Sequence, residues 1–320
     1  MAPWEAAAYD TALVGMHAVA LCLPPVLFLF DAPFGKFGVR SAWNVPGNAA
    51  WMLMEAVAPA SALFFAPRGP SVSELPAARA AMLALFLVHY SIRAVWQPLT
   101  NAPRSPLHAS VVASGMLFNL VNGLLVGLWL RGDGRDRSAT CQRDAARSWL
   151  ILLGLVLFAG GLAGNVAHDH ILRGLRKQGA HDQRAARGGA VHTLHAAYAI
   201  PHGGLFRWVS YPNYLCEWVE WSGFALCCHE CVTRAGSSGG LWSGALGSVR
   251  IPHRWDASSQ TSYLTVPGAF PLPHLSPPTL FVLVEIAVML PRAVRGHRWY
   301  HDRFGASYPR ARRAVIPWLV

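Results

Sequence analysis

Charged residues are scarce in this chain. Asp, Glu, Lys and Arg make up only 13% of its 320 residues, whereas a typical soluble domain has about a quarter. Hydrophobic residues account for 53%, the mean hydropathy is +0.30, and the apolar residues come in long runs. This pattern indicates a membrane protein and argues against an ordinary soluble enzyme.

Lysine is nearly absent, since Lys36 and Lys177 are the only two. The net charge of +11 therefore comes almost entirely from arginine. The basic residues cluster between the apolar runs, which favours cytosolic loops and a pocket for an anionic cofactor over a nucleic-acid surface. We therefore predict no nucleic-acid partner.

Cysteines are too few and too scattered to form a disulfide framework, with six over the whole chain. The cluster "CCHEC" at 227–231 is spaced too tightly and irregularly for a tetrahedral metal site, so we predict no metal. The N-terminus has neither the basic segment nor the small-residue cleavage site of a signal peptide. We expect the first apolar run to remain as a membrane anchor.

The apolar runs predict an all-α, polytopic membrane protein with a seven-transmembrane helix bundle and a single domain over residues 1–320. Basic loops follow the first, third, fifth and seventh runs, so that side is predicted to be cytosolic and the N-terminus lumenal. The 131–147 loop, in which arginines alternate with aspartates, falls on the far side. The predicted spans are residues 11–30, 47–66, 78–97, 107–130, 148–167, 205–228 and 275–291.

Residues 229–274 are rich in Gly, Ser and Pro and show no clear period. We interpret the segment as a loop insertion on the far side of the membrane. A gene-model insertion is the alternative for this segment and, more weakly, for residues 181–197.

Two apolar runs carry ionisable side chains near their midpoints. Glu55 lies in "WMLMEAV", and Tyr90 and Arg93 lie in "LVHYSIRAV". Ionisable groups inside a bilayer are rare and indicate functional sites by default. The structural alternatives are an ion pair between Glu55 and Arg93, and a packed tyrosine whose hydroxyl is hydrogen-bonded. We favour a site in the middle of the membrane.

The fifth run ends in "GNVAHDHILRGLRK", in which Asn165, Asp169, Arg173 and Arg176 are spaced by four, four and three residues. On a helix they share one face. A carboxylate followed by two guanidinium groups suits a ribose and phosphates. A basic helix touching anionic lipid is the alternative, but Asn165 lies deeper than that alternative needs.

The stretch "FRWVSYPNYLCEWVEWSGFAL" places three polar residues in an apolar run. If a helix opens at Pro212, then Asn213, Glu217 and Glu220 lie on one face. Asn213 and Glu217 suit an uncharged amide, which both donates and accepts hydrogen bonds. We expect the surrounding tryptophans to anchor this helix in the membrane.

The tail "RAVRGHRWYHDRFGASYPRARRAVIPWLV" combines His297, Arg298 and Tyr300 with many arginines. A cytosolic basic end is the alternative to a cofactor contact. Glu285, in the last span, has no evident role.

Taken in order, these motifs resemble the steroid 5α-reductase family, the 3-oxo-5α-steroid 4-dehydrogenases. The resemblance runs through "AWMLMEAVA", "LVHYSIRAVW", "GNVAHDHILRGLRK", "IPHGGLFRWVSYPNYLCEWVEWSGFAL" and "HRWYHDRFGASYPRARRAVIPWLV". It implies a seven-helix reductase of the endoplasmic reticulum membrane, most simply a monomer, whose C-terminal half (148–320) binds NADPH from the cytosol. The implied substrate is a hydrophobic steroid or terpenoid with a carbon–carbon double bond conjugated to a ketone.

The resemblance also implies roles for single residues. Glu55 and Tyr90 would hold the substrate carbonyl and stabilise the enolate that forms when hydride reaches the β-carbon. Glu55 donates only when protonated, and burial in apolar surroundings favours the neutral carboxyl. The cofactor pocket would comprise Asn165, Asp169, Arg173, Arg176, Tyr198, Asn213, Glu217, His297, Arg298 and Tyr300, together with the loop residues Lys36, Asn101 and Arg104.

Two positions depart from the family pattern. Met54 replaces a glutamine that often precedes the glutamate, and Phe34 replaces a common tyrosine. Without the glutamine amide the substrate need not be a conventional steroid, and a polyprenal or a trans-2-enoyl-CoA is the alternative. A membrane methyltransferase that uses S-adenosylmethionine and a lipid-binding protein without catalysis are the remaining alternatives.

Overall fold

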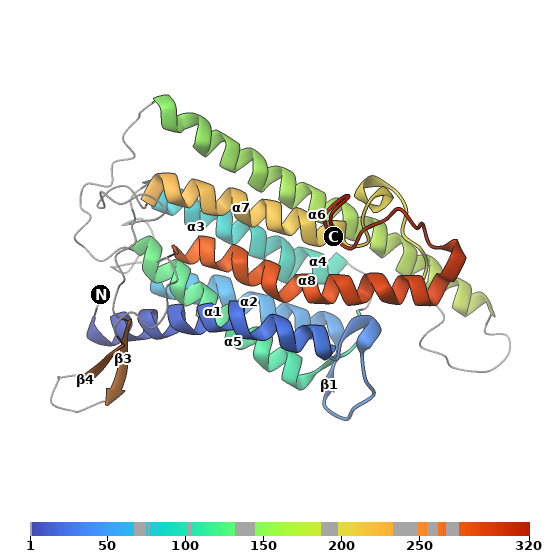
Figure 1. The fold of residues 1–320 in the computed structure, drawn as a ribbon, viewed down its shortest axis with the longest axis horizontal. Coiled ribbons are helices and arrows are strands. Elements are labelled where there is room, and N and C mark those ends of the chain that lie inside the picture. Colours follow the sequence, from blue (N-terminus) through green and yellow to red (C-terminus); the bar gives the residue numbers. More distant parts are fainter. Residues whose placement is uncertain are drawn as a thin grey trace.

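The structure, a computed structural model, describes residues 2–66, 75, 77–100, 104–131, 145–186, 198–232, 249–254, 262–266 and 275–320. Long helices dominate it and run side by side along one axis (Figure 1). The α-helices are α1 (Pro3–Leu29), α2 (Gly47–Phe65), α3 (Ala77–Tyr90), α4 (Gln97–Thr100), α5 (Ala109–Arg131), α6 (Ala145–Ala186), α7 (Pro212–Val232) and α8 (Pro277–Phe304). Two short antiparallel pairs complete it, β1 (Asn44–Val45) with β2 (Leu107–His108) and β3 (Val249–Arg254) with β4 (Ser262–Val266).

The all-α membrane class is confirmed, but the count of seven spans is not. Six described helices are long and apolar enough to cross a membrane: Trp4–Leu29, Gly47–Phe65, Ala77–Thr100, Ala109–Arg131, Trp149–Gly179 and Pro277–Ser307. The predicted sixth span, now α7, is not among them. Its asparagine and glutamates make it too polar to qualify on composition, although it has a span's length.

Small residues let α2 and α5 approach closely. Gly123 of α5 lies against the backbone of α2, where a Cβ would overlap the Ala58 carbonyl oxygen and come within 2.6 Å of Ser61 Cβ. Gly127 repeats this contact one turn later, against Ala62 and Phe65. Because lipid gives no hydrophobic drive for helix association, such close backbone packing is what stabilises helix pairs in a membrane.

Helices α6 and α7 form the other close pair. Gly161 and Gly164 face α7, where a Cβ at Gly161 would overlap the backbone nitrogen of Glu220. The helix α7 opens at Pro212, as the sequence predicts, because proline at a first helical position needs no hydrogen-bond acceptor. Asn165 to Arg176 lie on one unbroken helix, since α6 continues well past them.

The helical winding changes immediately after Tyr90, the last residue of α3. Residues Ser91–Trp96 form a π-helical segment, and the Gln97 N–H donates to the Ile92 carbonyl, five residues back. Pro98 has no N–H to continue the α-helical ladder, which favours this irregularity. Single-turn π segments often lie at functional sites, and this one contains Arg93.

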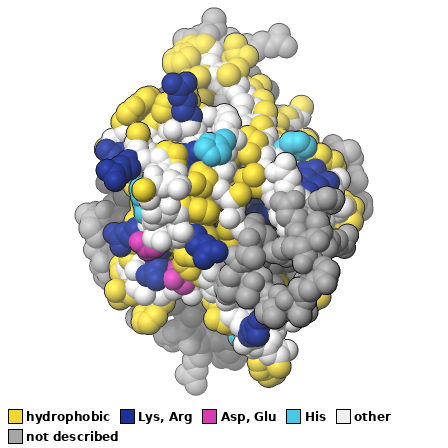
Figure 2. Space-filling view, turned by 90° about the vertical axis from the view of Figure 1, so that its right-hand side faces the viewer, with side chains coloured by type: hydrophobic (Ala, Val, Ile, Leu, Met, Phe, Trp, Pro, Cys, Tyr) yellow, Lys and Arg dark blue, Asp and Glu magenta, His cyan; other side chains and the backbone are white. Residues whose placement is uncertain are grey.

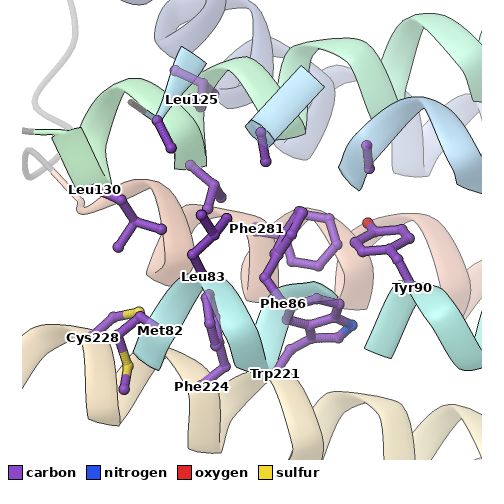
Figure 3. Close-up of a cluster of buried hydrophobic side chains, with 14 of the residues drawn as sticks. Met82, Leu83, Phe86, Tyr90, Leu125, Leu130, Trp221, Phe224, Cys228 and Phe281 are labelled. Carbon is purple, nitrogen blue, oxygen red and sulfur yellow. The ribbon is translucent and has the colours of Figure 1, made fainter. Parts of the chain in front are cut away.

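The core is aromatic between α3, α7 and α8 (Figure 3). Trp221 is 1% exposed and packs edge-to-face against Phe281, with ring centroids 4.8 Å apart. Trp218 is also buried, against Ala293 and Val315. The prediction that these tryptophans anchor α7 in lipid is therefore wrong; only Trp208, 40% exposed, has the exposure of an anchor.

The basic segments gather at one end of the bundle, opposite the N-terminus and the β3–β4 hairpin (Figure 1). Lys36 donates to the Gly296 carbonyl of α8, and Asn48 of α2 binds both the Pro98 carbonyl and the Arg104 N–H. The face at this end shows many Lys and Arg side chains and few acidic ones (Figure 2). Residues 132–144, which include most of the predicted far-side loop, lie outside the described residues.

The α2–α5 contact yields a stability test. We expect Gly123→Ala to lower the free energy of unfolding by about 1–3 kcal/mol, because its methyl group meets the α2 backbone. Gly160→Ala is the matched control, since nothing lies within 4 Å of a Cβ there and alanine favours a helix. Thermal unfolding of both variants in detergent measures the difference. Equal melting temperatures would contradict this packing.

Candidate active site in the membrane interior

Arg93 lies at the centre of a buried charge cluster. Its Nη2 is 3.5 Å from Glu55 Oε1 of α2 and 3.4 Å from Glu217 Oε1 of α7. The three side chains are between 7% and 13% exposed. One guanidinium therefore joins three elements. The ion pair between Glu55 and Arg93, predicted as the structural alternative, is present.

Asn165 extends this cluster to α6. Its Nδ2 donates to Glu217 Oε2 at 3.1 Å and to the Asn213 carbonyl oxygen at 3.4 Å. Asn165 is 1% exposed, and its Oδ1 is buried without a hydrogen-bond partner in the described residues. A buried amide oxygen without a donor is costly, so this atom marks a place where a ligand N–H fits.

Tyr90 is held by α5. Its hydroxyl donates to Asn119 Oδ1 at 3.3 Å and accepts from Asn122 Nδ2 at 3.2 Å. Both asparagines are buried inside a transmembrane helix. Among the residues that the structure describes, no hydrogen bond joins Tyr90 to Glu55. The two predicted carbonyl ligands thus belong to separate hydrogen-bonded groups, and a substrate oxygen would have to lie between them.

A second buried pair was not predicted. His89 Nδ1 lies 2.6 Å from Glu220 Oε1, with the histidine 2% and the glutamate 0% exposed. The Trp221 ring lies tilted against His89, with centroids 4.5 Å apart. Glu220 Oε2 has no partner in the described chain. This pair connects α3 to α7 directly beside Tyr90.

Two arginines at the basic end lie over tryptophan rings. Arg104 lies 4.4 Å from the Trp51 ring centre, and Arg173 lies 5.4 Å from the Trp96 ring centre. Burial lowers the pKa of Arg104 to about 10, while Asp169 opposes that shift and Arg176 adds to it. Arg173 Nε and Nη2 and Arg104 Nε are buried without partners in the described residues. These donors suit an anionic ligand such as a phosphate.

Lys36 lies in an aromatic cage. Its Nζ is 3.9 Å from the Tyr300 ring centre, 4.5 Å from Trp299 and 5.1 Å from Tyr211. Burial lowers the pKa of Lys36 to about 7, and the nearby Arg292 contributes to the shift. Tyr198 packs edge-on against Trp299 and hydrogen-bonds Ser105, and burial raises its pKa. The cage therefore brings the predicted pocket residue Tyr300 to Lys36, and Tyr198, also predicted, packs on the Trp299 ring of the same cage.

The remaining predicted residues divide into three cases. His297 Nδ1 lies 2.6 Å from Ser210 Oγ, which also contacts the Tyr308 hydroxyl at 2.6 Å. This chain of contacts fixes the tail against α8. Arg298 is exposed and has no ion pair in the described part of the chain. Asn101 lies outside the described residues.

Sequence reasoning missed the residues that hold the predicted ones. Asn119 and Asn122 stand three residues apart in "MLFNLVNGLL", and polar residues at helical spacing inside an apolar run are a usable signal. His89 carried the same signal, and Glu220, predicted to share a face with Asn213 and Glu217, binds His89 instead. Which helix each of them meets, however, depends on packing and is not encoded in spacing within one helix.

Comparisons of the sequence with known proteins identify a family. The sequence model described as 3-oxo-5-alpha-steroid 4-dehydrogenase matches residues 105–197, 191–234 and 272–320. The uncharacterized protein C9.08c of Schizosaccharomyces pombe is 33% identical over 92% of this chain and 94% of its own length. The steroid 5-alpha-reductase DET2 of Gossypium hirsutum is 29% identical, covering 96% and 95%. The 3-oxo-5-alpha-steroid 4-dehydrogenase 1 of Rattus norvegicus is 28% identical, covering 90% and 86%.

The central ion-pair cluster predicts a large stability effect. Arg93→Met leaves Glu55 and Glu217 without their cation, and we expect it to destabilise the protein by about 3–5 kcal/mol. Arg295→Met is the matched control, because the Arg295–Asp31 pair is about a quarter exposed and should contribute less than about 1 kcal/mol. Detergent unfolding curves compare the two. A smaller loss for Arg93→Met than for the control would refute the central role of Arg93.

Proposed function

Because this chain belongs to the 3-oxo-5-alpha-steroid 4-dehydrogenase family, we propose that it is an NADPH-dependent reductase of a carbon–carbon double bond conjugated to a ketone. The family is one of oxidoreductases, and the chain is a multi-pass membrane protein. The proposed substrate is a steroid-like or polycyclic terpenoid lipid. The proposed location is the endoplasmic reticulum membrane, with the basic end in the cytosol.

The observation that carries this proposal is the polar cluster inside an apolar bundle. Glu55, Arg93, Asn165 and Glu217 come from four elements and meet within the membrane-spanning region. Burying ions and amides inside a membrane is costly, and such groups usually mark a binding or catalytic site. A hydrophobic substrate reaches such a site from the lipid phase, and an anionic cofactor reaches it from the basic end.

The residues present fit NADPH. The unpartnered Asn165 Oδ1 accepts from an amide, as a nicotinamide carboxamide offers, while the free nitrogens of Arg173 and Arg104 donate to phosphates. The exposed Arg176 lies three residues after Arg173 on the same helix. When bound, NADPH would supply a hydride.

The proposed roles of Tyr90 and Glu55 follow from where charge develops. Hydride addition at the β-carbon places negative charge on the carbonyl oxygen, and donors positioned there lower the barrier. Asn119 and Asn122 hold the Tyr90 hydroxyl oxygen in place, and its proton has to turn from Asn119 Oδ1 to the substrate oxygen. Glu55 donates only as the neutral acid. Arg93 retains a second carboxylate, Glu217 at 3.4 Å, when Glu55 takes up a proton.

Met54 bears on the choice of substrate. It is 6% exposed and packs on Gly115, where a Cβ would come within 2.6 Å of its sulfur. An apolar side chain packed on α5 therefore stands at the position before Glu55 where the family often has an amide. This favours enone lipids other than conventional steroids as the second candidate substrate class, including a polyprenal.

The proposed activity has a direct test. Membranes that contain the protein are incubated with NADPH and testosterone or progesterone, and mass spectrometry looks for a product two hydrogens heavier. We expect Glu55→Gln to retain NADPH binding and to slow turnover by about a hundredfold, as the loss of an oxyanion donor does. Wild-type rates in Glu55→Gln would remove Glu55 from the mechanism. NADPH binding without any product would redirect the search to other enone lipids.

The lowered pKa of Lys36 predicts a pH dependence of cofactor binding. Its amine is protonated below about pH 7 and neutral above it. Only the charged form attracts a phosphate, so the NADPH dissociation constant should rise by up to about tenfold per pH unit above 7. Titrations between pH 6.5 and 8.5 measure this rise, with Lys36→Met as the comparison. An equally steep rise in Lys36→Met would show that another group is responsible.

A further inference from the structure

Glu285 of α8 is a carboxyl in a membrane-spanning helix to which neither the ion pairs of the described residues nor the proposed function gives a role. It is half-buried and follows Phe281 by one helical turn, on the same side of α8. Phe281 packs against Trp221 of α7 and Phe118 of α5. Glu285 therefore lies on the side of α8 that carries Phe281, next to the aromatic core.

The cations of this interior are already engaged. Arg93 pairs with Glu55 and Glu217, and His89 pairs with Glu220. In the part of the chain that the structure describes, the Glu285 carboxyl has neither an ion pair nor a hydrogen bond. An ionised carboxylate without a partner in an apolar interior is costly, so this position favours the neutral acid. A neutral carboxyl is a proton donor, and no described residue accepts a hydrogen bond from this one.

The position of Glu285 relative to Glu55 and Tyr90, the proposed ligands of the substrate carbonyl, indicates which substrate atom it serves. Glu285 interacts electrostatically with Glu55, Glu217, Arg93 and Tyr90. The same interior has the unpartnered atoms Asn165 Oδ1, in a residue 1% exposed, and Glu220 Oε2, in a residue 0% exposed, which points to a polar ligand. The α-carbon of an enone is bonded to its carbonyl carbon. A group near both carbonyl ligands is thus closer to the α-carbon than to a substituent at the far end of a sterol.

Resting on the proposed function, we propose that Glu285 is the acid that protonates the substrate α-carbon. The β-carbon accepts a hydride from the reduced cofactor, and the electron pair of the double bond moves to form an enolate. The enolate then takes the proton of the Glu285 carboxyl at its α-carbon, and the ketone re-forms. The resulting carboxylate regains its proton from water. The sum is one hydride and one proton added across the double bond.

The sharpest test of this step is to determine which face of the substrate α-carbon receives the proton. In D₂O the exchanged carboxyl delivers deuterium to one face of the α-carbon, so NMR of the wild-type product should show a single stereoisomer. We expect Glu285→Gln to turn over about a hundredfold more slowly, with deuterium on both faces, because water then supplies the proton. NADPH binding should be unchanged in this variant. Glu285→Asp should restore part of the rate.

Val288→Ala is the matched control for packing, one turn further along the same side of α8 and likewise in contact with the core. It should keep the wild-type deuterium pattern. A second readout needs neither cofactor nor turnover: the infrared difference between wild type and Glu285→Gln should contain the band of a protonated carboxyl.

The outcomes separate the two proposals. Reduction by the wild type with an unchanged rate and deuterium face in Glu285→Gln would overturn the proton-transfer step and leave the reductase intact. An absent carboxyl band would also overturn the step. A wild-type protein that binds NADPH and reduces no enone would overturn the proposed function, and the step with it.

Discussion

The interior of this protein depends on one guanidinium. Arg93 lies between Glu55 of α2 and Glu217 of α7, and through Glu217 it connects to Asn165 of α6. In a medium that cannot solvate ions, these carboxylates tolerate each other only because a cation stands between them. The constraint also fixes geometry, since the helices that carry these residues cannot slide or rotate without separating a charge from its partner.

The irregular winding of the third span serves this arrangement. The π-helical turn Ser91–Trp96 follows Tyr90 and contains Arg93. It turns Arg93 toward Glu55 and Glu217, while His89 and Tyr90, in the α-helix before it, contact Glu220 and α5. In a regular α-helix the angle between successive side chains is fixed, so Arg93 would point in a different direction relative to His89 and Tyr90.

Much of this could be predicted from local pattern. Helical spacing correctly placed Asn165 to Arg176 on one helix, Pro212 at the start of α7, and polar residues in the middle of spans. Partners between helices could not be predicted, because they depend on which backbones approach closely, as at Gly123 and Gly161. The location of the α7 tryptophans could not be predicted for the same reason. An amphipathic ring suits either the membrane interface or a protein core, and the packing of neighbouring helices determines which of the two it occupies.

The length of α6 has a consequence for what the protein can hold. Asn165, in the membrane interior, and Arg176, near the basic end, stand on one unbroken helix, so about 16 Å of fixed axial rise separates them. Under the proposed function, Asn165 binds an amide and Arg176 a phosphate, so the helix fixes the distance between the two contacts. A ligand that makes both contacts must then span that distance, and a shorter molecule with the same chemical groups cannot.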